Sequence, residues 1–182
     1  MIKLIAFGIL SLPVIYLSRR TLFKLKSHGF YRFFSWEGII WLFVSNFDHW
    51  FENAFGINQI FSWIFLLASV YLVLAGVLRL KKSGKSGTVR NDEALYPFEK
   101  TTELVDQGIF KYIRHPLYSS LLFLTWGIFL KCPSVSLFVV SLLSSVFLFI
   151  TSQFDEKECI VYFGEEYRAY MKRTKRFIPF VF

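Results

Sequence analysis

The chain has 182 residues, of which 54% are hydrophobic and 20% aromatic, and it carries a formal net charge of +8 at pH 7. Its apolar residues run in blocks and its mean hydropathy is +0.46, which indicates an integral membrane protein and excludes an ordinary soluble domain. The basic residues flank these blocks, so they indicate anionic lipid headgroups as partners and not nucleic acid.

The sequence divides into five hydrophobic segments, and we expect each to be a membrane-spanning helix of an all-α, polytopic membrane protein. Several are shorter than the ~20 residues that cross a bilayer core, so flanking aromatic and basic residues would extend them or the bilayer would thin locally. The first lacks a small-residue cleavage site and is followed at once by Arg19 and Arg20, which favours a retained span over a signal peptide. The segments cover residues 2–17, 36–50, 59–80, 117–131 and 135–153.

The distribution of basic residues predicts the topology. Lys and Arg follow the first, third and fifth segments, whereas the loop after the second holds Asp48 and Glu52 and no basic residue. Because basic loops stay in the cytoplasm, five crossings with the N-terminus outside satisfy the whole pattern. The basic residues are Arg19, Arg20, Lys24, Lys26 and Arg32, then Arg79, Lys81, Lys82, Lys85 and Arg90, then Arg168, Lys172, Arg173, Lys175 and Arg176.

The last two segments form the centre of the predicted functional part. The turn at Pro133 is short, which makes these segments antiparallel neighbours. Both outer ends of this hairpin are then cytoplasmic, so Arg114 and His115 are expected near Asp155 and Glu156. The expected parts are three N-terminal spans (1–80) and a catalytic part (81–182), the latter made of a cytoplasmic loop (81–116), the hairpin (117–153) and an amphipathic C-terminal segment (154–182).

A dense polar and aromatic cluster, residues 108–118, precedes the fourth segment. Arg114 and His115 are ionisable residues at the edge of a membrane segment, a costly arrangement that indicates a functional site. Pro116 suits the first turn of a helix, and non-helical residues ahead of it would leave free backbone N–H groups that attract a carboxylate or a phosphate. The alternative is an interfacial anchor, with Arg114 reaching headgroups and Tyr118 in the aromatic belt.

A second polar cluster follows the fifth segment. Asp155 and Glu156 would hold an amino group or a pair of ribose hydroxyls; the alternative is the solvated first turn of a cytoplasmic helix. Phe163, Tyr167 and Tyr170 share one helical face, and they would cap the site or lie on the membrane surface. The three histidines are scattered along the chain, so we assign no metal site.

Four motifs in the second half of the chain belong together. They are Arg114-His115-Pro116-Leu117-Tyr118, then Asp155-Glu156, then Phe163-Gly164-Glu165-Glu166-Tyr167, and finally Arg176-Phe177-Ile178-Pro179. In combination they resemble the isoprenylcysteine carboxyl methyltransferase and phospholipid methyltransferase superfamily of integral membrane enzymes. The resemblance covers roughly residues 79–182. It implies S-adenosylmethionine as the cofactor, bound on the cytoplasmic side by the last two spans and closed in by a C-terminal helix.

The resemblance also implies a set of site residues by position. Arg114 and His115 are the candidate catalytic residues, although a role of His115 in orienting the cofactor fits the resemblance better than one as a general base. The acidic pair of the family, usually two Glu residues, is Asp155-Glu156 here. The implied cofactor-binding residues are Leu104, Val105, Phe110, Tyr112, His115, Pro116, Leu117, Tyr118, Asp155 and Glu156.

Three departures from the family pattern bear on the methyl acceptor. Ser120 stands where the family usually has Gly, and Cys159 where it usually has Leu. Residues 150–153 contain no basic side chain, whereas the prenylcysteine enzymes place an Arg there for the substrate carboxylate. We therefore expect membrane lipids as partners and a lipophilic small-molecule or lipidated acceptor, with a prenylated protein C-terminus disfavoured.

Two other classes of function stay open. Sterol reductases use NADPH and carry a similar Arg-His-Pro-x-Tyr element, but they are longer and have more spans. A non-enzymatic membrane transporter or assembly factor would show polar residues near the middle of its spans. Ser141, Ser144 and Ser145 are weak candidates for such a path, since serines in spans more often mediate close helix packing.

Overall fold

The computed structural model describes residues 1–83 and 99–180, and these residues confirm the all-α class because they form helices and no strand. The predicted basic residues Lys85 and Arg90 lie outside the described residues. The α-helices are α1 (Ile2–Ser18), α2 (His28–Asn46), α3 (Ile57–Ser83), α4 (Pro116–Phe129), α5 (Val135–Phe163) and α6 (Glu165–Arg173); the 3-10 helices are η1 (Phe47–His49) and η2 (Gly108–Lys111).

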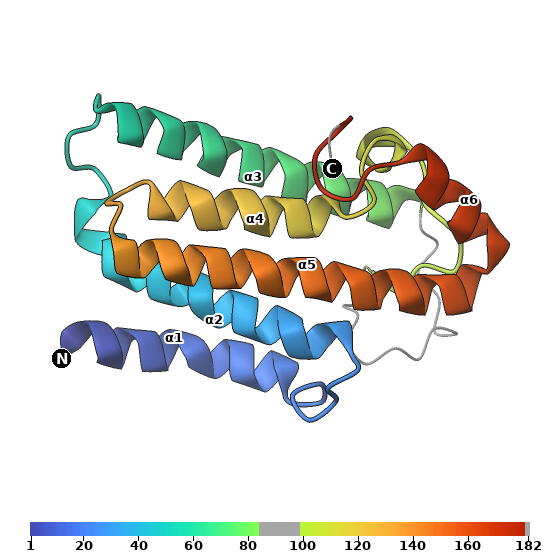
Figure 1. Ribbon diagram of the computed structural model, residues 1–182, viewed down its shortest axis with the longest axis horizontal. Coiled ribbons are helices and arrows are strands. Elements are labelled where there is room, and N and C mark those ends of the chain that lie inside the picture. The colour runs from blue at the N-terminus through green and yellow to red at the C-terminus, as the bar shows by residue number, and fades with distance from the viewer. Residues whose placement is uncertain (84–98, 181–182) are drawn as a thin grey trace.

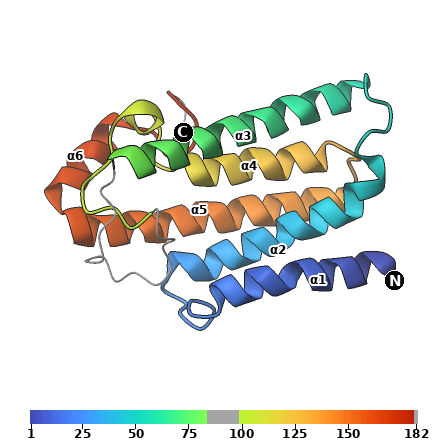
Figure 2. The same cartoon turned by 180° about the vertical axis from the view of Figure 1, so that it is seen from behind.

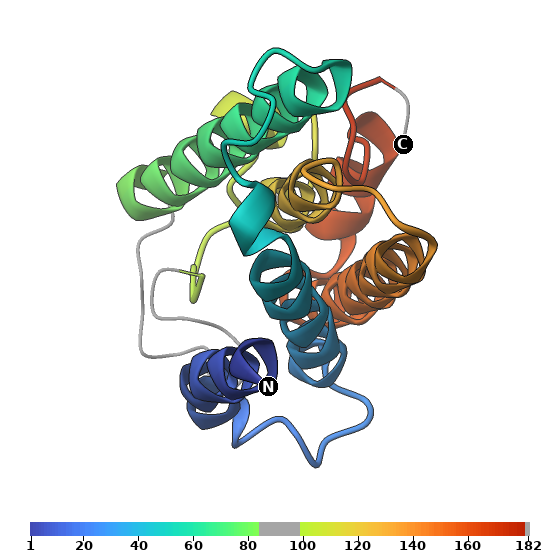
Figure 3. The same cartoon turned by 90° about the vertical axis from the view of Figure 1, so that its left-hand side faces the viewer.

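Helices α1 to α5 form an antiparallel bundle along one long axis, with α6 at one end (Figure 1). Helix α3 packs on α4, α2 on α5 and α1 on α2, so α1 and α3 are the outermost helices. The view from behind shows α6 and the end of α3 at the same end of the bundle (Figure 2). Seen down the axis, α4 lies in the middle, between α3 on one side and α2 and α5 on the other (Figure 3). The start of α4 is therefore surrounded by other elements.

Two of the described helices, α3 and α5, are long and apolar enough to cross a membrane, and α1 and α4 are apolar but shorter. The outward faces of the long helices are apolar: Leu67, Leu78 and Leu143 are each more than half exposed. Such surfaces are costly in water and are covered by acyl chains in a bilayer. These two helices and their exposed apolar faces indicate a membrane protein.

The helix ends depart most from the predicted segments at the start of α2 and at the end of α5. Helix α2 begins at His28, well before residue 36, because the Ser27 hydroxyl caps it by accepting a bond from the Gly29 amide at 3.2 Å. Helix α5 continues past residue 153 to Phe163, and Gly164 ends it with a positive φ of 61°. The acidic pair thus lies inside a helix and not beyond its end.

The interior of the bundle is held by a small apolar core and by close helix contacts. Ile39, Leu42, Leu66 and Ile128 form the core between α2, α3 and α4. A Cβ on Gly127 would lie 3.0 Å from the Leu66 side chain, so only glycine allows α3 and α4 to approach this closely. This packing fixes the position of α4, and with it the residues at its start.

Candidate active site

The start of α4 and the polar end of α5 meet, as the hairpin predicts. Arg114 Nε donates to Glu156 Oε1 at 2.8 Å, and His115 Nδ1 lies 3.4 Å from Asp155 Oδ2. Pro116 occupies the first turn of α4, with His115 as the residue that caps it. The expected juxtaposition of the two clusters is confirmed, and it rests on the antiparallel hairpin of α4 and α5.

The C-terminal segment lies alongside the residues that precede α4. The backbone amides of Arg114 and His115 donate to the carbonyls of Lys175 (2.8 Å) and Arg176 (3.2 Å). The Lys175 amide donates back to the Tyr112 carbonyl at 3.0 Å. The amides of Arg114 and His115 are therefore not free to bind an anion, which corrects the expectation for these two residues. Their backbone is instead held by a short parallel pairing.

Glu156 lies at the centre of a buried charge network. Its Oε1 accepts from Arg114 Nε (2.8 Å) and Arg176 Nε (3.1 Å) and lies 3.3 Å from His115 Nε2, while its Oε2 accepts from Arg176 Nη2 at 2.6 Å. Only 5% of its side chain is exposed. A buried carboxylate is stable when it is paired and hydrogen-bonded in this way. Glu156 therefore joins the start of α4 to the C-terminal segment.

The guanidinium of Arg114 has a further set of partners. Its Nη1 donates to the carbonyls of Thr174 at 2.5 Å and Met171 at 3.3 Å, in addition to the bond from Nε to Glu156. These partners come from α5 and from the end of α6. A planar guanidinium that binds three acceptors is fixed in direction, so Arg114 holds the C-terminal segment in place.

The imidazole of His115 is buried between two carboxylates and a ring. Its Nδ1 faces Asp155 and its Nε2 faces Glu156, and the ring stacks on Tyr118 with centroids 5.3 Å apart. Burial lowers the pKa of His115, but the hydrogen bonds and charges of Asp155 and Glu156 outweigh it, so the pKa lies above its ordinary value of 6.5. The two carboxylates thus stabilise the imidazolium form of His115.

These residues form one wall of a cavity that encloses about 660 Å³, counting the part open to solvent. Most of the predicted site residues line it, but Tyr112 and Glu156 are not among the lining residues. Glu156 lies behind His115 and Arg114, and its contact with a cofactor stays a prediction. The predicted residues on the wall are Leu104, Val105, Phe110, Arg114, His115, Pro116, Leu117, Tyr118 and Asp155.

The aromatic residues of the tail close the cavity on another side. Phe163, Tyr167 and Tyr170 all line it, although Gly164 separates the first from the other two. The hydroxyl of Tyr170 donates to the Phe110 carbonyl at 2.7 Å, which ties α6 to η2. Burial raises the pKa of both tyrosines above the ordinary value, so both stay neutral hydrogen-bond donors. Of the two positions that the sequence left open for the tail, the structure favours the cap.

Sequence reasoning missed several residues of this site. Leu80, Glu99, Thr101 and Cys159 also line the cavity, and Arg176 completes the charge network. Arg176 belongs to the closing motif of the resemblance, so a signal for it was present. Glu99 carries no such signal, because it follows a long polar stretch and is placed by its ion pair with Arg32 of α2 at 3.6 Å.

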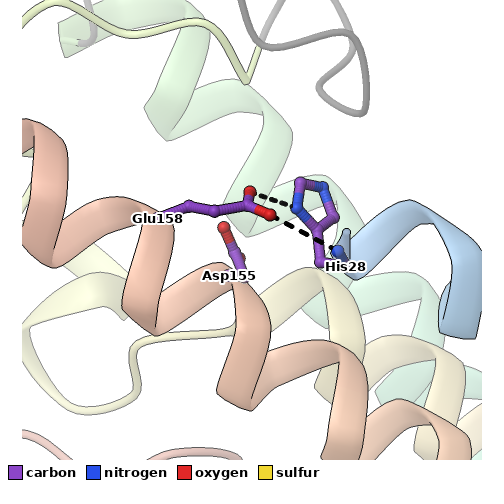
Figure 4. A group of neighbouring side chains, drawn as sticks. All are labelled: His28, Asp155 and Glu158. Carbon is purple, nitrogen blue, oxygen red and sulfur yellow. Dashed lines mark hydrogen bonds and ion pairs between the residues drawn. The ribbon is translucent and has the colours of Figure 1, made fainter. Parts of the chain in front are cut away.

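A second histidine lies next to the site, on the side of α2. His28 is fully buried, and its Nδ1 lies 2.5 Å from Glu158 Oε2 while its amide donates to Glu158 Oε1 at 3.4 Å (Figure 4). The ligand-type atoms of His28, Asp155 and Glu158 lie within 4.8 Å of one another. No sequence pattern joins these three residues in one site. The short distance between Nδ1 and Glu158 is that of a direct hydrogen bond, which ties α2 to α5.

Three methanethiol S-methyltransferases are similar to a part of this chain. The protein of Pseudomonas deceptionensis is 32% identical over 73 residues, which are 39% of this chain and 26% of that protein. Methanethiol S-methyltransferase 1 of Bradyrhizobium diazoefficiens is 28% identical over 39% of this chain and 24% of that protein. The protein of Crocosphaera subtropica is 26% identical over 41% of this chain and 28% of that protein. The similarity thus spans about a quarter of the length of these relatives. No solved structure matches the chain.

The profile of the phospholipid methyltransferase family matches residues 57–166. This range is more than half of the chain and includes α3, α4, α5 and the residues that line most of the cavity. The resemblance inferred from the motifs is therefore confirmed, and the chain belongs to the phospholipid methyltransferase family.

Proposed function

We propose that this protein is an integral membrane methyltransferase that uses S-adenosylmethionine and acts on a lipophilic or membrane-delivered acceptor. One observation carries the proposal: Arg114, His115 and Asp155, from the start of α4 and the end of α5, converge on the wall of one cavity. This convergence lies within the part of the chain that the methyltransferase family profile matches.

The lining of the cavity fits the chemistry of this cofactor. Phe110 and Tyr118 offer aromatic surface for a planar ring or for a cation such as a sulfonium. The carboxylates of Asp155 and Glu99 suit an amino group or ribose hydroxyls. The fit rests on a mixed set of groups and not on one charge.

S-Adenosylmethionine would supply a methyl group bound to a positively charged sulfur. When the methyl group is transferred, the sulfur becomes a neutral thioether. The protein then mainly has to align donor and acceptor and exclude water. Aromatic rings at Phe110 and Tyr118 would stabilise the cation by about 1 kcal/mol each. Both ring nitrogens of His115 face carboxylates, which supports an orienting role for His115 over one as a general base.

The arrangement of the helices supports a topology of five crossings with the N-terminus outside. The basic residues after α1, at the end of α3 and in α6 lie at the same end of the bundle as the cavity (Figure 1). Asp48 and Glu52 lie at the opposite end. Because basic ends stay in the cytoplasm, the cavity would open to cytoplasmic S-adenosylmethionine while the acceptor arrives from the bilayer.

The choice of acceptor rests on the relatives and on the apolar part of the cavity lining. The named relatives act on methanethiol, a small apolar thiol, and the family is named for phospholipids. Leu80, Leu104 and Leu117 give the cavity an apolar edge that suits a lipophilic acceptor. We therefore propose methanethiol and membrane lipids as the first acceptors to test.

The direct test is equilibrium binding of methyl-labelled S-adenosylmethionine to the purified protein in detergent. We expect Asp155→Asn to weaken binding tenfold or more, since it removes a charge from the cavity wall. The matched control is Asp106→Asn, which removes a carboxylate that pairs with Arg173 on the surface, and we expect an affinity within twofold of the wild type. Equal affinities for both variants would contradict the site.

A second arm separates the proposal from a reductase. Parallel thermal-shift titrations with S-adenosylmethionine and NADPH should show stabilisation by the former alone. Incubation with labelled cofactor, methanethiol or total membrane lipids should then place the label on the acceptor. Stabilisation by NADPH alone would overturn the proposed function.

A further inference from the structure

A groove separate from the cavity runs along the outer face of α3. Its walls are the last turns of α3 and the residues around η2, and it encloses about 970 Å³, counting the space open to solvent. It has no lining residue in common with the cavity. The residues that line it are Tyr71, Ala75, Leu78, Arg79, Lys82, Gly108, Ile109, Lys111 and Tyr112.

The polarity of this groove changes along its length. Tyr71, Ala75 and Leu78 form a stripe on one face of α3, and the stripe continues to Arg79 and Lys82. Eleven helical steps of 1.5 Å make it about 17 Å long. Tyr71 and Leu78 are 65% and 64% exposed, although α3 is one of the two helices apolar enough to cross a membrane. The groove therefore runs from lipid-facing apolar surface to a basic end.

The basic end carries three cations. Arg79, Lys82 and Lys111 line it, and none of the described residues that line the groove is acidic. Arg79 Nη2 donates to the side chain of Gln107, whereas its buried Nε has no acceptor among the described residues. The end is thus complementary to a phosphate in charge.

We infer that this groove binds an anionic phospholipid, with its phosphate between Arg79, Lys82 and Lys111 and its acyl chain along Leu78, Ala75 and Tyr71. The order of apolar and basic surface along the groove matches the order of chain and headgroup in a lipid at the membrane surface. A soluble phosphate would use only the basic end. The inference depends on no assumption about the cofactor.

The groove and the cavity are separated by η2. Phe110 is buried and lines the cavity, whereas its neighbours Ile109 and Lys111 line the groove. Gly108 has a φ of +63°, and a Cβ there would lie 3.4 Å from the Arg79 stem. The lipid would thus contact a wall of the cavity from outside without entering it.

The test is lipid retention, measured by native mass spectrometry after reconstitution in mixed phosphatidylcholine and phosphatidylglycerol nanodiscs. We expect the wild type to retain phosphatidylglycerol in preference. Lys82→Gln with Lys111→Gln should reduce that preference about 25-fold, roughly fivefold for each lysine. The control, Lys26→Gln with Lys172→Gln, removes the same charge from exposed positions outside the groove and should leave the preference within twofold.

A second pair of variants tests the apolar half without a change in charge. Ala75→Trp fills the groove and should abolish retention, whereas Leu67→Trp, on the exposed face of α3 outside the groove, should not. Equal lipid retention by Ala75→Trp and Leu67→Trp would overturn the inference. An equal loss of the phosphatidylglycerol preference in the groove pair and in the control pair of lysine variants would overturn it too. Competition by soluble glycerophosphoglycerol as strong as by the lipid would overturn it as well, since the acyl chain would then contribute nothing.

Discussion

The two ends of the helical bundle both bury cations, but they do so in different ways. At the cavity end, Arg114 and Arg176 share the carboxylate of Glu156. At the opposite end, Lys131 Nζ donates to the Gln59 amide oxygen at 2.9 Å and lies 3.7 Å from the Trp63 ring centroid. The described residues place no carboxylate against Lys131. Among the buried cations of the described residues, those of the cavity end are paired with a carboxylate, whereas Lys131 lies among neutral groups.

This difference distinguishes a functional site from polar contacts that only stabilise the helix ends. At the end with Lys131, the polar side chains bond to helix ends: Asn46 donates to the Ile128 carbonyl, and Gln59 to the Lys131 carbonyl. Such bonds satisfy backbone groups that a helix leaves open. At the cavity end, Asp155 and His115 reach beyond the network to the cavity surface. Buried polarity alone thus does not identify the active end; the cavity beside it does.

The largest effect is expected from the centre of the charge network. Glu156→Ala leaves Arg114, Arg176 and His115 without their shared partner, and it should cost about 3–5 kcal/mol of stability because breaking a buried pair leaves charges uncompensated. The measurement is thermal or denaturant unfolding in detergent. The control is Glu165→Ala, whose side chain is 90% exposed in its pair with Arg168, and which should change stability by less than about 0.5 kcal/mol. Equal effects would show that the network is not a buried unit.

The opposite end should respond in stability but not in binding. Lys131→Met keeps the length of the side chain, removes its bond to Gln59 and should cost about 1–2 kcal/mol. Affinity for labelled S-adenosylmethionine should stay within twofold of the wild type, since Lys131 follows the end of α4 that is remote from the cavity. A tenfold loss of affinity in this variant would contradict the contrast between the two ends.

A smaller effect is expected where α6 meets η2. Tyr170→Phe removes the bond to the Phe110 carbonyl and should cost about 1 kcal/mol of stability. It should also weaken cofactor binding by several-fold, because the cap of the cavity is less firmly held. Tyr16→Phe, at a position that is 64% exposed on α1, is the control and should change neither quantity. Unchanged binding in Tyr170→Phe would remove α6 from the proposed site.

The smallest expected effect is a pH dependence that belongs to the cavity end. The folded pKa of His115 is raised above its unfolded value of 6.5, so its stabilising contribution is complete below pH 6.5 and is lost as pH rises through the folded pKa. The stability difference between wild type and His115→Gln should therefore shrink as pH increases. A difference that grows with pH would contradict the pairing.

The sequence predicted the parts of the site that depend on local rules. Pro116 fixes the start of α4, and the short turn at Pro133 makes the hairpin, so the meeting of His115 with Asp155 follows from local signals. The hydrophobic run ends near residue 153, which led to a predicted end of the fifth span there. The helix continues because the polar side chains beyond that point find partners, Glu158 with His28 among them.

Other parts of the site depend on contacts that leave no local pattern. The pairing of Lys175 and Arg176 with Arg114 and His115 is made by backbone groups, which every residue carries. Glu156 joins α5 to the C-terminal segment because Arg176 donates to it. The chain brings Arg176 to Glu156 only because it turns after α6. Sequence patterns identified the acidic pair but not which of its members faces the cavity.

The most direct test of the proposed active end is to locate bound S-adenosylmethionine on the chain. Irradiation of the protein with methyl-labelled cofactor, followed by peptide mapping, should place the label in residues 99–118 and 155–170, which contain most of the cavity wall. Glu156→Gln, if folded, should reduce the labelling, and Lys131→Met should not. Label confined to residues 71–79 of α3 or to the end of the bundle near Lys131 would contradict the proposal that the cavity holds the methyl donor.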